Sequence, residues 1–287
     1  MKKVAWIGTG VMGKPMALHL AQAGYEVTAY NRTHSKALEL QDSVRVVDNI
    51  IDCVKEADLV FTIVGFPQDV REVYFKEDGI LNHVKEGAIV IDMTTSSPAL
   101  AKEIYTAALN KNVHALDAPV TGGDKGAREK TLSIMVGGNE KVYQEVVNTL
   151  EILGSTVTYM GKAGNGQHTK LANQICIAGS ISTTAEALTY ARKHGLDLQL
   201  MLRVINNGSA SSWQSQNNGP KMVIHDKEPG FFIKHFIKDL RLAMTEKENI
   251  ELPILRQVLD QYESLLEDGY ADFGTQAIID YYTKNNS

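Results

Sequence analysis

The sequence predicts an α/β protein in which a Rossmann-type, doubly wound and mostly parallel sheet is followed by an all-helical C-terminal domain. Three observations lead to this prediction. Short apolar runs alternate with helix-like segments over the first half of the 287 residues, a glycine turn follows the first run, and the pattern becomes purely helical after about residue 162. The expected domains are therefore 1–162 and 163–287, each long enough to bury a core.

The apolar runs of the first half have the length and near-continuous apolar character of strands that are buried on both faces. They are KVAWIG (3–8), EVTAYN (26–31), DLVFTIV (58–64), AIVIDM (88–93), VHALDA (113–118) and LSIMVGG (132–138). Helix-like segments lie between several of them, such as MGKPMALHLAQAG, which ends at Gly24, a natural helix stop. This alternation predicts a parallel sheet that helices cover on both faces.

The second half carries one long helical pattern over residues 165–194, about 30 residues or roughly 45 Å. Further helices are expected at 197–207, 234–249 and 251–268, whereas the polar, glycine-bearing segment 206–220 is expected to be a loop. A helix of this length cannot bury apolar residues on all sides within so small a domain. We therefore expect another subunit to cover it, in a homodimer or homotetramer.

Composition excludes several classes of function. The net charge of −5 gives no electrostatic support for a nucleic-acid partner, and no run of 18 apolar residues predicts a membrane span. The two cysteines, Cys53 and Cys176, have no CxxC spacing, which is typical of a cytoplasmic protein. The eight histidines include no HxxxH or HExxH arrangement, so no metal site is expected.

The glycine turn GTGVMG has the GxGxxG spacing of dinucleotide-binding loops, and it stands between a strand and a helix as that function requires. Gly8 allows the tight turn, Gly10 lets a pyrophosphate approach the backbone, and Gly13 allows close helix packing. Free N–H groups at the helix start attract phosphate. The residues expected to contact the cofactor here are Gly8, Thr9, Gly10, Val11, Met12 and Gly13.

The end of the second strand favours NADP(H) over NAD(H). An acidic residue there usually binds the ribose 2′-hydroxyl of NAD, but this chain has NRTHSK, with Asn31, Arg32, Thr33 and Lys36. Arg32 can bind a 2′-phosphate, and Thr33 and Lys36 can add contacts. The alternative is that Arg32 and Lys36 are solvated surface charges.

Four segments in order resemble the β-hydroxyacid dehydrogenase family, which includes 3-hydroxyisobutyrate dehydrogenase, tartronate semialdehyde reductase and the glyoxylate/succinic semialdehyde reductases. They are WIGTGVMGKPMALHL near the start, DAPVTGGDKGA (117–127), GKAGNGQHTKLANQ (161–174) and KDL (238–240), with IDMTTSSP (91–98) as a weaker fifth. The resemblance spans nearly the whole chain. It implies a Rossmann domain, a helical domain and an active site in the cleft between them.

The resemblance gives roles to the polar residues of these segments. Lys170 is the expected catalytic proton donor, because reduction of a carbonyl leaves negative charge on oxygen that an ammonium can neutralise. Asn173 and Gln174 share its helix face and are expected to orient it or bind substrate. The family often has asparagine where Gln174 stands. The glycine loop of Thr121, Gly122 and Gly123 can hold a substrate carboxylate.

Four further residues are expected near the cofactor, and one more at the substrate. Thr95, Val64 and Gly65 follow strands, and ligands of open α/β sheets gather at the carboxyl ends of strands. By resemblance, Lys238 lies near the nicotinamide, and Asp239 contributes to substrate binding and helps to fix the geometry.

These observations predict an NADP(H)-dependent oxidoreductase that acts on a small carboxylic acid, either a β-hydroxyacid or its semialdehyde or keto acid. Two alternatives stay open. An imine reductase is built on a similar plan, although such enzymes commonly lack a lysine at the position of Lys170. A non-catalytic NADPH-binding protein would keep the glycine turn without turnover.

Overall fold

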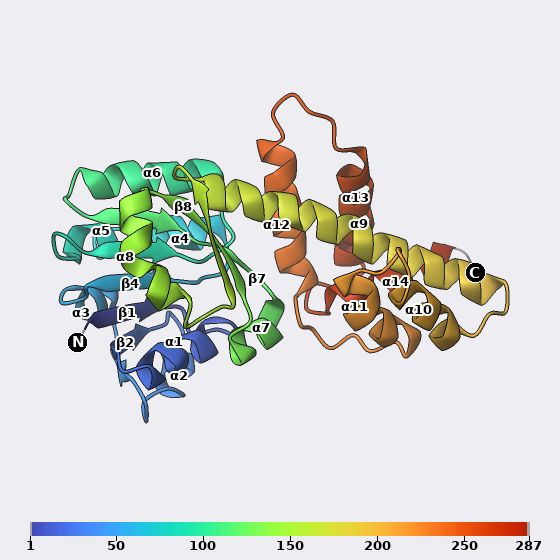
Figure 1. Cartoon of the computed structure of the whole chain (residues 1–287), viewed down its shortest axis with the longest axis horizontal. Helices are drawn as coiled ribbons and strands as arrows, with labels where there is room; N and C mark the ends of the chain where they lie inside the picture. Colours follow the sequence, from blue (N-terminus) through green and yellow to red (C-terminus); the bar gives the residue numbers. More distant parts are fainter. Residues whose placement is uncertain (1, 286–287) are drawn as a thin grey trace. The chain divides into compact units, whose positions relative to one another are not determined.

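The computed structural model of the protein describes residues 2–285, which form two compact units that divide between Lys170 and Leu171. The first unit is an α/β domain, and the second consists of helices (Figure 1). The predicted fold class is therefore confirmed. The two units meet within one helix, whereas the boundary expected from the sequence, at residue 162, falls just before that helix begins.

The sheet of the first unit follows the order β3-β2-β1-β4-β5-β6-β8-β7, with β9 also paired to β8. Its strands are β1 (Lys3–Ile7), β2 (Glu26–Tyr30), β3 (Arg45–Val46), β4 (Leu59–Thr62), β5 (Ile89–Asp92), β6 (His114–Asp117), β7 (Val120–Thr121), β8 (Ser133–Gly138) and β9 (Thr156–Gly161). The first six strands are parallel, and the order reverses beside β1. In doubly wound sheets this reversal is where a ligand binds, so the fold places the glycine turn after β1 at the expected position.

Each of the six apolar runs forms a strand, as predicted, but the far side of the sheet is more complex than the sequence indicates. The sixth run, β8, pairs antiparallel with β6 and β7 and parallel with β9. The short strands β3 and β7 and the strand β9 were not expected. β9 has mostly half-exposed residues, so it lacks the continuous apolar run by which a buried strand is recognised.

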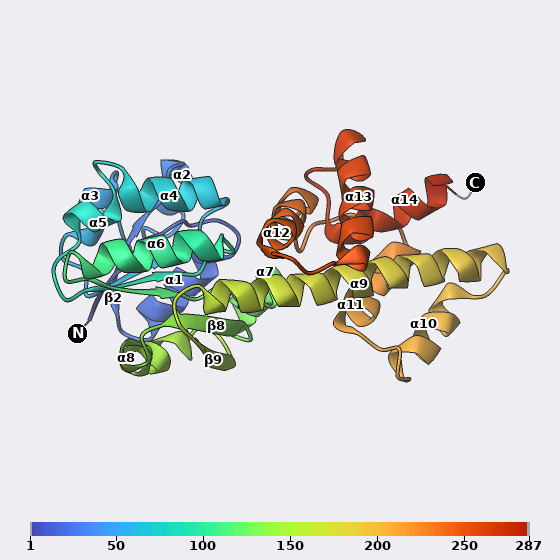
Figure 2. The same cartoon turned by 90° about the horizontal axis from the view of Figure 1, so that it is seen from above.

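Alternate residues of the central strands enter two separate cores, which explains their unbroken apolar character. In β1, Val4 and Trp6 belong to one core, and Ala5 and Ile7 belong to the other. Helices α4, α5 and α6 lie over one face and α8 over the opposite face (Figure 2). The helices of this unit are α1 (Gly13–Gln22), α2 (His34–Leu38), α3 (Ile50–Val54), α4 (Pro67–Phe75), α5 (Ile80–His83), α6 (Pro98–Leu109), α7 (Gly123–Glu129) and α8 (Glu140–Leu150).

The second unit packs its helices around an apolar core that includes Phe236, Leu240 and Tyr262. Its helices are the continuation of α9 (Asn165–Lys193), then α10 (Leu198–Asn206), α11 (Trp213–Val223), α12 (Ile233–Glu246), α13 (Pro253–Glu267), the 3-10 turn η1 (Thr275–Ala277) and α14 (Ile278–Asn285). The four helices predicted from the sequence are present. Within residues 2–285, none is long and apolar enough to cross a membrane.

The predicted loop 206–220 is wrong over most of its length, because Trp213–Val223 forms α11. Ser212 and Ser215 cap the start of this helix reciprocally, since each side chain accepts a hydrogen bond from the backbone N–H of the other. Such a pair stabilises a helix start whose composition otherwise favours a loop. Pro220 stands inside the helix, which is why the sequence indicated a break there.

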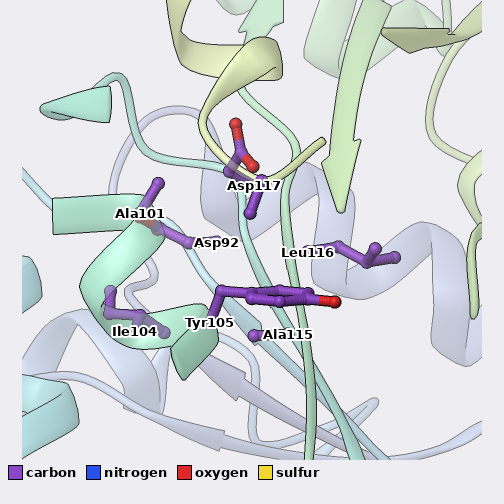
Figure 3. A pocket seen from close by; sticks show the side chains of 8 residues that line it. Asp92, Ala101, Ile104, Tyr105, Ala115, Leu116 and Asp117 are labelled. Atoms are coloured by element: carbon purple, nitrogen blue, oxygen red, sulfur yellow. The ribbon is translucent and has the colours of Figure 1, made fainter. Parts of the chain in front are cut away.

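A buried polar network lies at the carboxyl ends of β4 and β5. The Asp92 carboxylate accepts hydrogen bonds from the Thr62 hydroxyl at 2.8 Å and from the Thr94 N–H at 3.1 Å. Tyr74 contacts the Thr62 hydroxyl at 3.2 Å. Burial raises the pKa of Asp92 to about 6, although these hydrogen bonds oppose the shift. Beside it, a cavity of about 10 Å³ lies between Asp92 and Asp117 (Figure 3), close to the least volume that holds one water molecule.

We expect Asp92→Asn to stabilise the protein by up to about 3 kcal/mol at about pH 7.5. The pKa of about 6 in the folded state lies above the ordinary value of 3.8, so the folded state binds the proton more tightly. The free energy of unfolding therefore falls as the pH rises from the ordinary pKa of 3.8 to the folded-state pKa of about 6. Asparagine keeps an acceptor for Thr62 and Thr94 and carries no charge. Urea unfolding at several pH values measures the difference, which should shrink toward about pH 4; a variant less stable than the native protein at every pH would contradict the interpretation.

Candidate active site

The glycine turn after β1 contains two glycines that the fold itself requires. Gly8 has φ +99°, and a Cβ at Gly8 would lie 2.1 Å from the carbonyl oxygen of Ile63. A Cβ at Gly13 would lie 1.9 Å from the carbonyl oxygen of Gly8, because α1 begins directly against the turn. Gly10 differs, since among the described residues no atom beyond Gly10 and its two chain neighbours lies within 4 Å of a Cβ built there. The space beside Gly10 is therefore available to a ligand.

The turn also offers polar groups suited to a phosphate-bearing cofactor. The Thr9 side chain is buried, and its hydroxyl has no hydrogen-bond partner among the described residues. The Thr9 N–H donates to the Asn31 side-chain oxygen at 3.0 Å, and the Asn31 amide donates to the Thr33 carbonyl at 2.9 Å. Met12, the residue before α1, provides no side-chain cap for the helix N–H groups. The predicted cofactor residues of the two loops are thus brought together, and they fit a dinucleotide.

Arg32 lies after β2, where its side chain is 78% exposed and forms an ion pair with Asp69. The Arg32 guanidinium donates a hydrogen bond to the Asp69 carboxylate at 2.7 Å, and this bond is the main reason that the pKa of Arg32 is raised. The second oxygen of Asp69 accepts from the Phe66 N–H at the start of α4. The backbone therefore fixes Asp69, which accepts a hydrogen bond from one nitrogen of the Arg32 guanidinium. Thr33 and Lys36, which follow Arg32 in the sequence, are exposed.

The segments after β4 and β5 are joined by hydrogen bonds. The Val64 N–H donates to the Thr94 hydroxyl at 3.0 Å. Thr95, the next residue, is half-buried, and so are Val64 and Gly65. The predicted nicotinamide-side residues therefore belong to two adjacent strand ends, as parallel pairing of β4 with β5 requires.

The predicted carboxylate loop has an unusual backbone. Gly122 has φ +131° and Gly123 has φ +65°, so two successive residues adopt conformations that favour glycine. The loop joins β7 to α7, and Thr121 is the last residue of β7. Thr121 and Gly123 are half-buried and Gly122 is exposed.

Lys170 stands in the second turn of α9 and is only 6% exposed. His168, two residues earlier on the same helix, is exposed. An ordinary helix-surface lysine keeps its ammonium in water, and lysine is rarely buried without a stabilising environment. The burial of Lys170 therefore argues against an ordinary solvated position on the surface of the helix.

In the second unit, the polar residues that follow Lys170 in α9 form a group with two residues in the middle of α12. The Asn173 amide donates to the Gln174 side-chain oxygen at 2.9 Å, and the Gln174 amide donates to Asp239 at 2.7 Å. Lys238 forms an ion pair with the other oxygen of Asp239 at 2.8 Å. Gln174 and Asp239 are each 1% exposed. Asp239 therefore joins the two helices while it balances the charge of Lys238.

Sequence reasoning missed three polar residues that hold this arrangement. Asp69 lies 37 residues from its partner Arg32, so no local spacing indicates the pair. Asp117 and Gln167 stand within the motifs that carry the family resemblance, but their side chains are buried and bond to the backbone. The spacing of Gln167, three residues before Lys170 in the same predicted helix, is the signal that could have indicated it. Within residues 2–285, no group of three or more His, Cys, Asp or Glu side chains is placed to hold a metal ion.

Comparison with known families divides the chain at nearly the same position as the structure. Residues 3–161 match the NAD binding domain of 6-phosphogluconate dehydrogenase. Residues 164–282 match the family described as the NAD-binding domain of NADP-dependent 3-hydroxyisobutyrate dehydrogenase.

Individual relatives cover almost the whole chain. An uncharacterised oxidoreductase of Bacillus subtilis is 46% identical over 99% of both chains. The 2-hydroxy-3-oxopropionate reductase of Escherichia coli is 37% identical over 87% of this chain and 86% of that protein. The structure of a 3-hydroxyisobutyrate dehydrogenase of Mycobacterium tuberculosis with L-serine superposes with a TM-score of 0.90 over 100% of each chain, at 30% identity.

The open space at Gly10 allows a test that separates cofactor binding from folding. We expect Gly10→Ala to melt at the native temperature yet to bind NADPH at least about tenfold more weakly, because the methyl group would occupy the place of the pyrophosphate. Gly13→Ala is the matched control, and it should lose thermal stability as well, since its Cβ would overlap the Gly8 carbonyl. Melting curves and a fluorescence titration with NADPH measure both effects. Native NADPH affinity in Gly10→Ala would contradict the assignment of the turn.

Proposed function

Because the chain belongs to the β-hydroxyacid dehydrogenase family, we propose that it transfers hydride between NADP(H) and a small β-hydroxyacid or the corresponding semialdehyde or keto acid. Candidate substrates are of the 3-hydroxyisobutyrate, tartronate semialdehyde, glyoxylate and succinic semialdehyde type. The relative that reduces 2-hydroxy-3-oxopropionate supports this substrate class. The observation on which the proposal rests is the burial of Lys170, at 6% exposed, where a helix-surface lysine would be solvated.

Lys170 is the proposed proton donor in the reductive direction. When bound, the reduced nicotinamide supplies hydride to the carbonyl carbon. Negative charge then develops on the substrate oxygen, and the Lys170 ammonium donates a hydrogen bond and finally a proton to that oxygen. In the oxidative direction, the neutral amine accepts the hydroxyl proton. Burial excludes water and strengthens the interaction between the ammonium and the developing oxyanion.

The remaining polar residues bind the substrate in this proposal. The N–H groups of Gly122 and Gly123 and the hydroxyl of Thr121 bind its carboxylate, because consecutive glycines leave backbone donors uncovered. Asn173 and Gln174 provide amides to the substrate or to Lys170. The buried Asp239 accepts a hydrogen bond from Gln174 and forms an ion pair with Lys238, and this supports a role in fixing their positions.

The proposed cofactor is NADP(H) rather than NAD(H), with Gly8 to Gly13, Asn31, Thr33, Lys36, Val64, Gly65, Thr95 and Lys238 as its further contacts. Arg32 supports the preference, since its guanidinium is exposed and Asp69 occupies only part of its five N–H donors. A carboxylate so close to a 2′-phosphate opposes its binding, so Asp69 should moderate the preference. We propose a cytoplasmic location, which is supported by the two cysteines, since both are free thiols. In the cytoplasm, a preference for NADPH favours the reductive direction.

We also propose that the chain forms a homodimer or homotetramer through its second unit. Large apolar side chains of α9, α10 and the turn between them are exposed, namely Tyr190, Leu196, Leu200 and Val204. A groove of about 530 Å³ lies among α9 and α10 residues such as Ala187, Met201 and Ile205. Contiguous exposed apolar surface of this kind is typical of an interface between subunits.

Replacement of the buried lysine tests the proposed function. We expect Lys170→Met to lower kcat by about 10²–10⁴-fold, while NADPH binding stays within about threefold of native, because methionine keeps the volume and removes the proton. Lys193→Met, at an exposed position in the last turn of the same helix, is the control and should keep full activity. NADPH consumption is measured with glyoxylate, succinic semialdehyde, tartronate semialdehyde and methylmalonate semialdehyde.

Each other outcome of that screen favours a stated alternative. NADPH binding without turnover of any of these compounds would make the chain a non-catalytic binding protein. A cyclic imine is added to the screen for this purpose, and its turnover without turnover of the four aldehydes would make the chain an imine reductase. Full activity in Lys170→Met would remove Lys170 from the mechanism.

The cofactor preference depends on two opposing side chains. We expect Arg32→Ala to lower the ratio of kcat/KM for NADPH to that for NADH by about tenfold or more, because it removes the phosphate partner. Asp69→Asn should raise the same ratio, since it removes the opposing charge. Arg203→Ala, at an exposed arginine of α10, is the control. Steady-state rates with NADPH and with NADH give these ratios. An unchanged ratio in Arg32→Ala would show that a group other than Arg32 binds the 2′-phosphate of NADPH.

A further inference from the structure

Gln167 makes both of its side-chain hydrogen bonds to the backbone that flanks Thr95. Its side-chain oxygen accepts from the Ser96 N–H at 2.8 Å, and its side-chain nitrogen donates to the Thr94 carbonyl at 2.8 Å. The Gln167 side chain is 0% exposed, so neither bond competes with water. The amide therefore holds the segment after β5 from both sides of Thr95.

The same residue is held at the start of α9 by Asp117, the last residue of β6. The Asp117 carboxylate accepts from the Gly164 N–H at 2.8 Å and from the Gln167 N–H at 2.9 Å. It lies beside the first turn of α9 in Figure 3. A carboxylate at a helix start satisfies N–H groups that have no partner within the helix.

The backbone of the first turn of α9 packs so closely against the sheet that only glycine fits at the points of contact. A Cβ at Gly166 would lie 2.4 Å from the Met135 carbonyl oxygen. A Cβ at Gly137 would lie 2.5 Å from the Asp117 carboxylate and 2.8 Å from the Gly166 nitrogen. The helix backbone therefore contacts β6 and β8 directly, and the position of Gln167 is fixed in two independent ways.

These contacts form one continuous path from the cofactor side to the proposed proton donor. The Val64 N–H bonds to Thr94, Thr94 bonds to Gln167, and Lys170 stands three residues after Gln167 in the same helix. Residues three apart lie on one side of a helix, one turn from each other. Every residue of this path belongs to the first unit.

We propose that Gln167 is a positioning residue that sets the distance between the Thr95 segment and the Lys170 ammonium, and so aligns proton transfer with hydride transfer. The proposal rests on the proposed function, because it needs Lys170 as the proton donor. Gln167 itself contacts neither substrate nor cofactor. A misplacement of about 1 Å between reacting groups can cost about 10²-fold in rate, so loss of the two hydrogen bonds should act on kcat.

The test compares variants of similar volume. We expect Gln167→Met to lower kcat about 10–100-fold, with KM for NADPH and for the aldehyde within about threefold of native. Gln261→Met is the matched control, because Gln261 is also a buried glutamine, 5% exposed, that bonds to Ser182 and Tyr282 in the second unit. It should lose comparable thermal stability and keep its kcat.

A conservative variant supplies a readout that a merely structural role would not move. In Gln167→Glu, the side chain keeps an acceptor for the Ser96 N–H but donates to the Thr94 carbonyl only when it is protonated. We expect its kcat, relative to native at the same pH, to recover as the pH is lowered. A constant ratio across the pH range would contradict the positioning role.

The outcomes separate this proposal from the proposed function. If Lys170→Met keeps native turnover, the proposed function fails whatever Gln167 does. If Lys170→Met is inactive while folded Gln167→Met has native kcat, the positioning role alone fails. A loss in Gln167→Met that equals its unfolded fraction, or that falls wholly on KM, would likewise overturn the positioning role.

Discussion

The buried carboxylate of Asp117 is the contact on which the arrangement of the first unit depends. It ends β6 and accepts two N–H groups at the start of α9, so it joins the sheet to the helix that carries Lys170. Burial raises the pKa of Asp117, while the backbone hydrogen bonds oppose that shift. The charge is tolerated because the helix start supplies the donors that water would otherwise supply.

The sequence was sufficient for features that depend on local pattern. The apolar runs identified six strands because both faces of the central sheet are buried, as Trp6 and Ile7 illustrate on successive positions. The GxGxxG spacing identified the turn, since Gly8 and Gly13 are required by contacts only a few residues away or at the adjoining strand end. The family resemblance identified Lys170, and its burial agrees with a role inside a site rather than on a helix surface.

Features that depend on distant partners could not be predicted in this way. Asp69 meets Arg32 only because α4 begins near the end of β2, and Gln167 meets Ser96 across 71 residues of sequence. The helix α11 was missed because a reciprocal serine cap outweighs a composition rich in Asn, Ser and Gly. In each case a specific side chain forms a hydrogen bond, with another side chain or with a backbone N–H, and the average composition of a segment does not indicate such a contact.

The boundary between the two units falls between Lys170 and Leu171, inside α9, so the chain passes from one to the other without a linker. A cut there would leave four carbonyls unpaired on one fragment and four N–H groups on the other. Neither of the two new chain ends would lie at a natural helix terminus. Exchange of one half with that of another protein would therefore require a new helix end as well as a new partner, unless the junction were moved to the start of α9 at Asn165.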